Sequence, residues 1–151
     1  MKNLLPDVKV ISFEAQKDFY LKLAAKTNHL NNIQHYCVAL GDENKTSVFH
    51  KNEYSGASSI LESHENLAEI FPACADFSKE KVEMVKLDDF IKHNRIELKK
   101  NILMKIDVQG FELNVLKGAS EILSSIFVVI AEVNFINLYK KQCRFSDIYS
   151  F

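Results

Sequence analysis

Apolar runs of strand length recur along the chain and are separated by polar or amphipathic segments. The runs are residues 8–13 (VKVISF), 35–41 (HYCVALG), 81–87 (KVEMVKL), 102–106 (ILMKI) and 126–135 (IFVVIAEVNF). β-branched and aliphatic residues in runs of this length favour strands. Because residues 126–135 are continuously apolar rather than alternating, they are predicted to form a parallel strand covered on both faces.

Helical patterns follow three of these strands. Phe19 and Leu23 share one face of a helix that follows the first strand, and Asp88 is an acceptable N-cap for a helix over residues 88–94. A third helix begins at Gly110 or Phe111 and is stopped by Gly118. Strands alternating with helices predict right-handed βαβ units and an α/β fold with a mainly parallel sheet.

The middle of the chain departs from this alternation. Residues 46–50 (TSVFH) follow a turn signal and are predicted to pair with residues 35–41 as a hairpin. Residues 51–79 are polar and show no sustained period, so they are predicted to be a long loop with one helical turn at residues 65–70.

Composition narrows the class of protein. The 151 residues are 47% apolar and 26% charged, which predicts one globular domain. The 19 Lys and Arg residues nearly balance 20 Asp and Glu residues, so no nucleic-acid partner is indicated. Three separated cysteines without a C-x-x-C motif are expected to be reduced thiols. The apolar runs are too short for a signal peptide or a membrane span, and the expected location is cytoplasmic.

Acidic residues stand at or near the predicted carboxyl ends of the strands, where parallel sheets bind their ligands. They are Glu14, Asp107 and Glu132. A carboxylate at such a position suits the two hydroxyls of a ribose, whereas its structural alternative is to stabilise a helix N-terminus. Three acids at one edge repel one another unless a cation, a bound hydroxyl or a raised pKa relieves them, and this favours a functional arrangement.

Several segments resemble, in order and spacing, the FkbM family of S-adenosylmethionine-dependent methyltransferases. They are VISFEAQKDFYLKL, CVALGDENKTSVFH, SSIL, LMKIDVQGFELNVLKGA and VIAEVNFINLYKKQCRFSDIYSF. The resemblance implies a Rossmann-like methyltransferase sheet and O-methylation of a hydroxyl on a sugar, lipid, polyketide or similar small molecule. It also implies that Glu14 binds the cofactor ribose, that Asp107 lies beside the reacting methyl group, and that a further segment lies by the adenine. That segment is Ala39, Leu40, Gly41 and Asp42.

Methyl transfer to oxygen needs the acceptor held in line and relieved of its proton. Asp107 or Glu132 is the candidate general base. Alternatively, Asp107, Glu112 and Glu132 together hold Mg²⁺, which prefers oxygen ligands and acidifies a bound hydroxyl.

The chain departs from the family pattern at both ends. A glycine-rich turn of the form D-x-G-x-N-x-G is expected after a first strand, but the four glycines, Gly41, Gly56, Gly110 and Gly118, do not have that spacing. The C-terminal hairpin of the family is also not recognised. Residues 1–151 are therefore interpreted as a single partial domain, truncated at both ends, whose first strand belongs between residues 8–13 and 102–106.

Two functions follow from this interpretation. The chain is a methyltransferase whose glycine turn lies upstream or comes from a partner chain or a homo-oligomer, or it is a catalytically inactive fragment that serves at most as an interaction module. In an enzyme, residues 51–79 and the segment after Glu132 are expected to choose the acceptor. There, Phe135 and Tyr139 stand one helical turn apart, although simple packing on the sheet explains them equally well.

Overall fold

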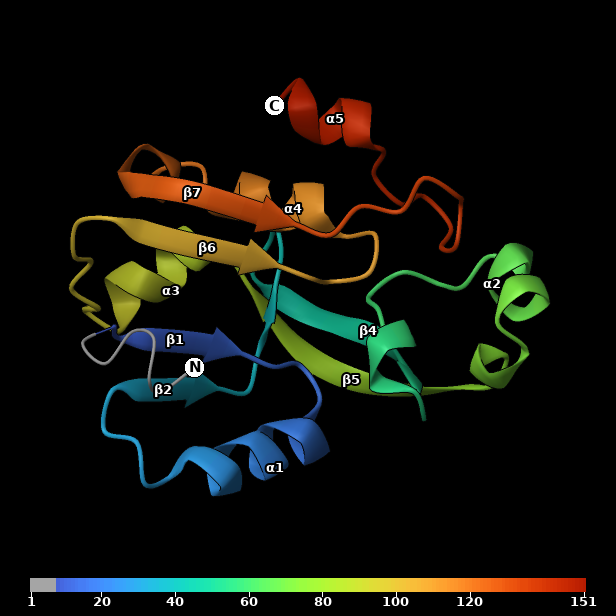
Figure 1. The fold of residues 1–151 in the computed structure, drawn as a ribbon, viewed down its shortest axis with the longest axis horizontal. Coiled ribbons are helices and arrows are strands. Elements are labelled where there is room, and N and C mark those ends of the chain that lie inside the picture. Colours follow the sequence, from blue (N-terminus) through green and yellow to red (C-terminus); the bar gives the residue numbers. More distant parts are fainter. Residues whose placement is uncertain (1–7) are drawn as a thin grey trace.

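Parallel strand pairs make up most of the β-structure in this computed structural model, which describes residues 8–151 (Figure 1). The strands are β1 (Val10–Phe13), β2 (Ile33–Tyr36), β3 (Ala39–Leu40), β4 (Lys45–Asn52), β5 (Phe77–Val85), β6 (Ile102–Ile106) and β7 (Ile126–Ala131). Strand β1 pairs with β2, β3 with β5 and β6 with β7, all parallel, while β4 runs antiparallel to β5. The fold is thus mixed α/β with separate small sheets, and the mainly parallel Rossmann-like sheet predicted from the sequence is not confirmed.

The helices follow the predicted alternation. They are α1 (Lys17–Thr27), α2 (Glu65–Ile70), α3 (Leu87–His93), α4 (Glu112–Gly118) and α5 (Phe145–Tyr149), with 3₁₀ turns at Ser55–Ala57, Pro72–Cys74 and Ile122–Ser125. The predicted strand over residues 102–106 and the helical turn over residues 65–70 are confirmed at the same bounds. The longest helix, α1, has 11 residues, and none within residues 8–151 has the length and apolar character to cross a bilayer.

The predicted hairpin is wrong. Residues 35–41 are divided between β2 and β3, which belong to different sheets, and β5 lies between β3 and β4. Strand β5 pairs through Met84 with Ala39 on one side and Lys45 on the other. A turn signal indicates where the chain reverses, but it does not show that a later strand inserts between the two neighbours.

Asp88 caps a different helix from the one predicted. Helix α3 has Lys86 as its N-cap, and Asp88 lies inside the first turn, only 5% exposed. Its carboxylate accepts hydrogen bonds from the backbone N–H groups of Glu121 (2.9 Å) and Ile122 (3.2 Å). The buried acid therefore satisfies donors at the start of the 3₁₀ turn at Ile122–Ser125 and fixes that turn against α3.

Strands β1 and β6 share packing partners without being hydrogen-bonded to each other. Phe13 of β1 and Met104 of β6 both pack on the buried cluster of Leu87, Ile91 and Ala119. Within residues 8–151, β1 pairs with β2 alone and β6 with β7 alone. In Figure 1 the strands follow the order β7, β6, β1, β2 and point the same way. The two parallel pairs thus leave a β1 edge and a β6 edge without a partner strand among the described residues.

Strand β7 is more exposed than its sequence predicts. Phe127 is 79% exposed and Ile130 is 48% exposed, although a strand covered on both faces was expected. Helix α4 packs through Val115 and Leu116 on Ile106 of β6, and the last residue of β7, Ala131, packs against the same cluster. The apolar sequence shows that β7 could be buried, but burial also requires other elements to pack on both of its faces. Among the described residues, few side chains pack on β7.

Candidate functional site

The carboxyl end of β1 presents Glu14 to the start of α1. Glu14 Oε1 accepts a hydrogen bond from the backbone N–H of Gln16 (2.8 Å), which is the N-cap residue of α1. Burial raises the pKa of the Glu14 carboxyl, partly opposed by the backbone N–H groups of Gln16 and Ala15 and assisted by the negative charge of Glu80. A carboxylate has about four lone-pair positions, so most of the accepting capacity of Glu14 is still available to a ligand.

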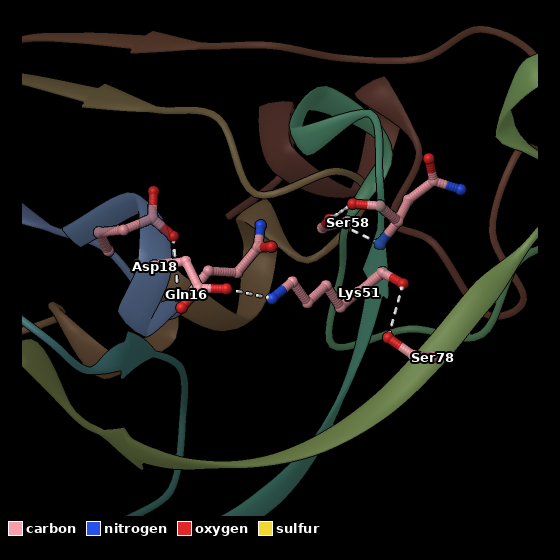
Figure 2. A network of polar contacts seen from close by, with 7 residues as sticks. Gln16, Asp18, Lys51, Ser58 and Ser78 are labelled. Carbon is pink, nitrogen blue, oxygen red and sulfur yellow. Dashed lines mark hydrogen bonds and ion pairs between the residues drawn. The ribbon is translucent and has the colours of Figure 1, made fainter. Parts of the chain in front are cut away.

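Gln16 places a second acceptor in this region. Its side chain is 3% exposed, and Oε1 has no donor among residues 8–151. Figure 2 shows the surroundings: Lys51 Nζ of β4 contacts the Asp18 carboxylate of α1 (2.7 Å), and the Lys51 carbonyl accepts a hydrogen bond from Ser78 Oγ (3.5 Å). The ion pair joins the β1–α1 unit to β4 beside Glu14.

The carboxyl end of β6 carries a partly exposed carboxylate with a cation beside it. Asp107 Oδ2 lies 2.7 Å from Lys105 Nζ, and Oδ1 accepts a hydrogen bond from Gln109 Nε2 (3.0 Å). Partial burial would raise the pKa of Asp107, but the hydrogen bonds from Lys105 and Gln109 outweigh it, and the pKa lies below its usual value of 3.8. Asp107 is therefore held in its ionised form.

Gln109 is a site residue that the sequence analysis did not identify. Its Nε2 also donates to Glu132 Oε1 (3.3 Å), so one amide group joins the two carboxylates that follow β6 and β7. The backbone of Gln109 is left-handed, with φ of 54°, and Gly110 follows with φ of 92°. A polar residue immediately before glycine at the end of a buried strand was the available signal, because such turns aim their side chains at the carboxyl edge.

Glu112 has a structural role that separates it from this group. It is 2% exposed, and its Oε1 accepts the backbone N–H groups of Val108 (3.2 Å) and Gly110 (3.1 Å), while Oε2 accepts the thiol of Cys143 (3.4 Å). These bonds hold the backbone on both sides of Gln109 in place.

The Mg²⁺ prediction for Asp107, Glu112 and Glu132 is not supported. Within residues 8–151 no group of three or more His, Cys, Asp or Glu side chains is arranged to hold a metal. The reason lies in the neighbours: Lys105 already compensates Asp107, and the loop N–H groups and a thiol occupy Glu112.

The predicted adenine segment is largely engaged in packing. Ala39 belongs to a buried cluster with Phe49, Val82, Met84 and Phe111, and Leu40 packs beside two further clusters. Gly41 donates its N–H to Val85 O (3.0 Å), and a Cβ at Gly118 would meet the Gly41 carbonyl oxygen. Asp42 Oδ2 accepts a hydrogen bond from Asn114 Nδ2 (2.9 Å). Adenine binding by this segment stays a prediction.

Residues 51–79 meet the segment after Glu132 over the Gln109 turn. Ser59 Oγ donates to Gln109 O (2.8 Å), Tyr139 Oη donates to Ala57 O (3.0 Å), and Lys140 N donates to Glu62 O (2.8 Å). The two regions predicted to choose the acceptor are therefore in direct contact.

Phe135 and Tyr139 do not share a helical face, contrary to the prediction. Phe135 is 90% exposed and Tyr139 is 2% exposed. The Gln142 side chain accepts the backbone N–H groups of Leu138 (2.8 Å) and Tyr139 (3.0 Å) and donates to Ile136 O (2.7 Å). Because this amide occupies backbone groups that a helix would use, the segment is a folded loop.

The carboxyl ends of β1 and β6 converge on one apolar floor. Ala15, next to Glu14, and Val108, next to Asp107, both pack against the cluster that contains Phe49 and Phe111. Comparison with protein families then identifies the chain, because the model of the methyltransferase FkbM domain matches residues 4–151. The chain belongs to the FkbM methyltransferase family. Neither the comparison with curated proteins nor that with solved structures gives a match.

Membership of the FkbM family implies S-adenosylmethionine as cofactor, and the described residues fit one part of it. Glu14 has unused acceptor positions that suit hydroxyl donors such as those of the ribose. Gln16 Oε1 has no donor among residues 8–151, but it is buried and not accessible to a ligand in this structure. The glycines do not form a cradle for the methionine part of this cofactor, because added Cβ atoms at Gly41, Gly110 and Gly118 would meet the chain's own atoms.

Two surface hollows, of about 430 and 440 Å³, lie away from Glu14 and Asp107. The first is lined by residues 98–101 and 124–127, near the amino ends of β6 and β7, and the second by residues from Asn134 to Ser146. The convergent acids, unlike these open hollows, lie at the carboxyl ends of strands, where parallel sheets form their binding sites.

Proposed function

We propose that this FkbM-family chain is the acid-bearing part of an S-adenosylmethionine-dependent O-methyltransferase that acts on a hydroxyl of a small molecule. The observation that supports the proposal most directly is the convergence of two strand ends, those of β1 and β6, on one apolar floor. Each end carries a carboxylate, Glu14 or Asp107, with capacity to bind a ligand.

We assign different roles to these side chains because their surroundings differ. Glu14 is half-buried and accepts the ribose hydroxyls, which would relieve the cost of burying its charge. Asp107, Gln109 and Glu132 face the acceptor, orient its hydroxyl and take its proton. The cofactor, when bound, supplies an electrophilic methyl group on a sulfonium.

We further propose that the complete site needs one more parallel strand between β1 and β6. Both edges lack a partner strand within residues 8–151, and both strands pack on the cluster of Leu87, Ile91 and Ala119. Unpaired apolar edges bind other strands readily. A strand from a partner chain or from a second copy would complete the sheet and bring backbone N–H groups to the cofactor.

Calorimetric titration of S-adenosylmethionine into the folded chain tests the function, with circular dichroism to establish folding first. Saturable binding with a dissociation constant of about 1 to 100 μM, equivalent to roughly −8 to −5.5 kcal/mol, supports an assembled cofactor site. Glu14→Ala should then weaken binding by about 1 to 3 kcal/mol, because charged hydrogen bonds are lost. Asp107→Asn should retain binding and abolish methyl transfer.

The absence of binding heat from a folded sample would instead support the alternative function, an inactive interaction module. The unpaired β1 and β6 edges are the observation that favours this alternative. Unchanged turnover in an active Asp107→Asn variant would remove that residue from the mechanism.

A further inference from the structure

We propose that Gln109 is a positioning residue that gives two neighbouring carboxylates different roles: Asp107 remains the charged partner of Lys105, and Glu132 accepts the proton of the substrate hydroxyl. This inference rests on the proposed function and deepens it. In the transfer, the acceptor oxygen bonds to the methyl carbon as the carbon–sulfur bond breaks, the sulfur leaves as a thioether, and the hydroxyl proton moves to the Glu132 carboxylate.

The geometry of one amide group carries the argument. Gln109 Nε2 lies 3.0 Å from Asp107 Oδ1 and 3.3 Å from Glu132 Oε1, so its two hydrogens can serve one carboxylate each. On the opposite side of the amide, Tyr139 Oη lies 3.3 Å from Gln109 Oε1, and its single hydrogen is shared between this oxygen and the closer Ala57 O (3.0 Å). The reverse orientation would turn the amide oxygen toward two carboxylates, which repel it, so the charges fix which way the amide points.

The turn itself is held on both sides of Gln109. Glu112 accepts the N–H groups of Val108 and Gly110, and Ser59 Oγ donates to the Gln109 carbonyl oxygen. Left-handed backbone at a residue other than glycine is uncommon, and here the flanking bonds maintain it. A side chain on so constrained a backbone loses little entropy when it binds the carboxylates.

The surroundings of the two carboxylates are unequal. Asp107 lies 2.7 Å from the Lys105 ammonium of β6. Glu132 receives the Gln109 amide at 3.3 Å, also contacts Asp107, and is influenced by the Lys105 charge without forming an ion pair with it among the described residues. The other groups nearby are the neutral Tyr139 hydroxyl and the Glu112 carboxylate beneath the turn. A carboxylate paired with a cation is a weaker proton acceptor than one bound to a neutral amide. Burial would raise the pKa of Asp107, but the hydrogen bonds from Lys105 and Gln109 lower it below 3.8, and this agrees with the division.

Carbon-13 NMR titration of carboxyl-labelled Asp and Glu in the full chain tests the inference. In the wild-type chain, the pKa of Asp107 should lie below its usual value of 3.8. Gln109→Asn keeps a residue that tolerates left-handed backbone but shortens the side chain beyond reach of the carboxylates. We expect it to raise the proton affinity of Asp107 by about 3- to 10-fold, because a hydrogen bond to the charged form is lost.

Controls separate positioning from folding. Gln34→Asn, on the exposed face of β2, should leave the Asp107 titration unchanged, and circular dichroism should show both variants folded. Tyr139→Phe should shift Asp107 in the same direction as Gln109→Asn, by a smaller amount, since it removes the bond that orients the amide.

Two results would overturn the inference: an unchanged Asp107 titration in folded Gln109→Asn, or a wild-type Asp107 whose pKa is at or above 3.8. Neither result requires cofactor. Failure of the wild-type chain to bind S-adenosylmethionine is measured separately and overturns the proposed function, so the two failures are distinguishable.

Discussion

At the scale of single residues, the acids of the carboxyl edge differ through their neighbours. Glu14 receives a backbone N–H, Asp107 an ammonium, Glu132 an amide, and Glu112 two backbone N–H groups and a thiol. The same side-chain chemistry therefore yields a ligand-binding candidate, a fixed charge, a candidate base and a structural anchor. Spacing along the sequence cannot distinguish these roles, because each depends on segments that fold in from elsewhere.

Replacing Glu112 should destabilise the fold strongly. Glu112→Ala leaves the N–H groups of Val108 and Gly110 without their acceptor in a buried place, and we expect a loss of about 2 to 4 kcal/mol in the free energy of unfolding. Glu112→Gln retains an acceptor oxygen and should lose less. Urea denaturation measures both losses. Equal losses would show that keeping the shape and one acceptor oxygen of Glu112 is not enough to stabilise the turn.

The burial of Glu14 should appear as a pH dependence of stability. Its pKa in the folded chain lies above the ordinary value of 4.5, so the folded chain binds this proton more tightly than the unfolded chain. The resulting stabilisation is complete below pH 4.5 and is lost as the pH rises through the folded pKa. Glu14→Gln, which carries no charge, should be more stable than the wild-type chain at pH 7.

The stability difference between Glu14→Gln and the wild-type chain should close as the pH approaches 4. Thermal denaturation of both proteins across this range checks the sign. A Glu14→Gln chain that is less stable than the wild-type chain at pH 7 would show that the charge is well compensated in the fold.

At the scale of elements, Tyr139 joins the loop after β7 to the long segment between β4 and β5, residues 53–76. Tyr139→Phe removes the hydrogen bond to the buried carbonyl of Ala57 and should cost about 1 kcal/mol. Tyr149→Phe is a matched control, because Tyr149 is 82% exposed in α5. Hydrogen exchange should become faster in residues 57–63 of the first variant only, and identical exchange in the two would contradict the fastening role.

The close approach of α4 to the end of β3 depends on Gly118. An added Cβ would meet the Gly41 carbonyl oxygen, which belongs to the backbone and cannot turn aside. We expect Gly118→Ala to cost about 3 kcal/mol or more. In contrast, a Cβ at Gly56 meets nothing within 4 Å, so Gly56→Ala should leave the melting temperature nearly unchanged. A tolerated Gly118→Ala would mean that α4 shifts easily.

The sequence predicted local features better than distant ones. The strand at residues 102–106 and the helical turn at residues 65–70 depend on nearby side chains, and both were placed correctly. The pairing of β3 with β5, across some forty intervening residues, leaves no local pattern. The acids at the strand ends were identified because the carboxyl ends of parallel strands lie at one edge of a sheet. The role of Gln109 and the hydrogen bonds of Glu112 depend instead on the left-handed turn at Gln109, which the hydrophobic pattern does not predict.

At the scale of the whole molecule, the described chain exposes apolar strand residues that a larger sheet would cover. Leu103 of β6 is 60% exposed on a strand with an unpaired edge. We therefore expect association that increases with concentration in sedimentation velocity, and Leu103→Lys should weaken it by adding charge at the edge. Leu21→Lys, at a 53% exposed position on α1, should not. A wild-type chain that remains monomeric at every concentration would contradict this expectation.

The contact between residues 53–76 and the Gln109 turn should also affect where a protease cuts the chain. Long surface loops are ordinarily the first places that a protease cuts, because cleavage requires several residues to unfold locally. Residues 57–64 are instead bonded to β4, to the Gln109 turn and to the segment after β7. Subtilisin should thus spare residues 57–64 and cut in the exposed stretch around Lys99 and Lys100, between α3 and β6, which separates the β6–β7 pair from the rest of the chain.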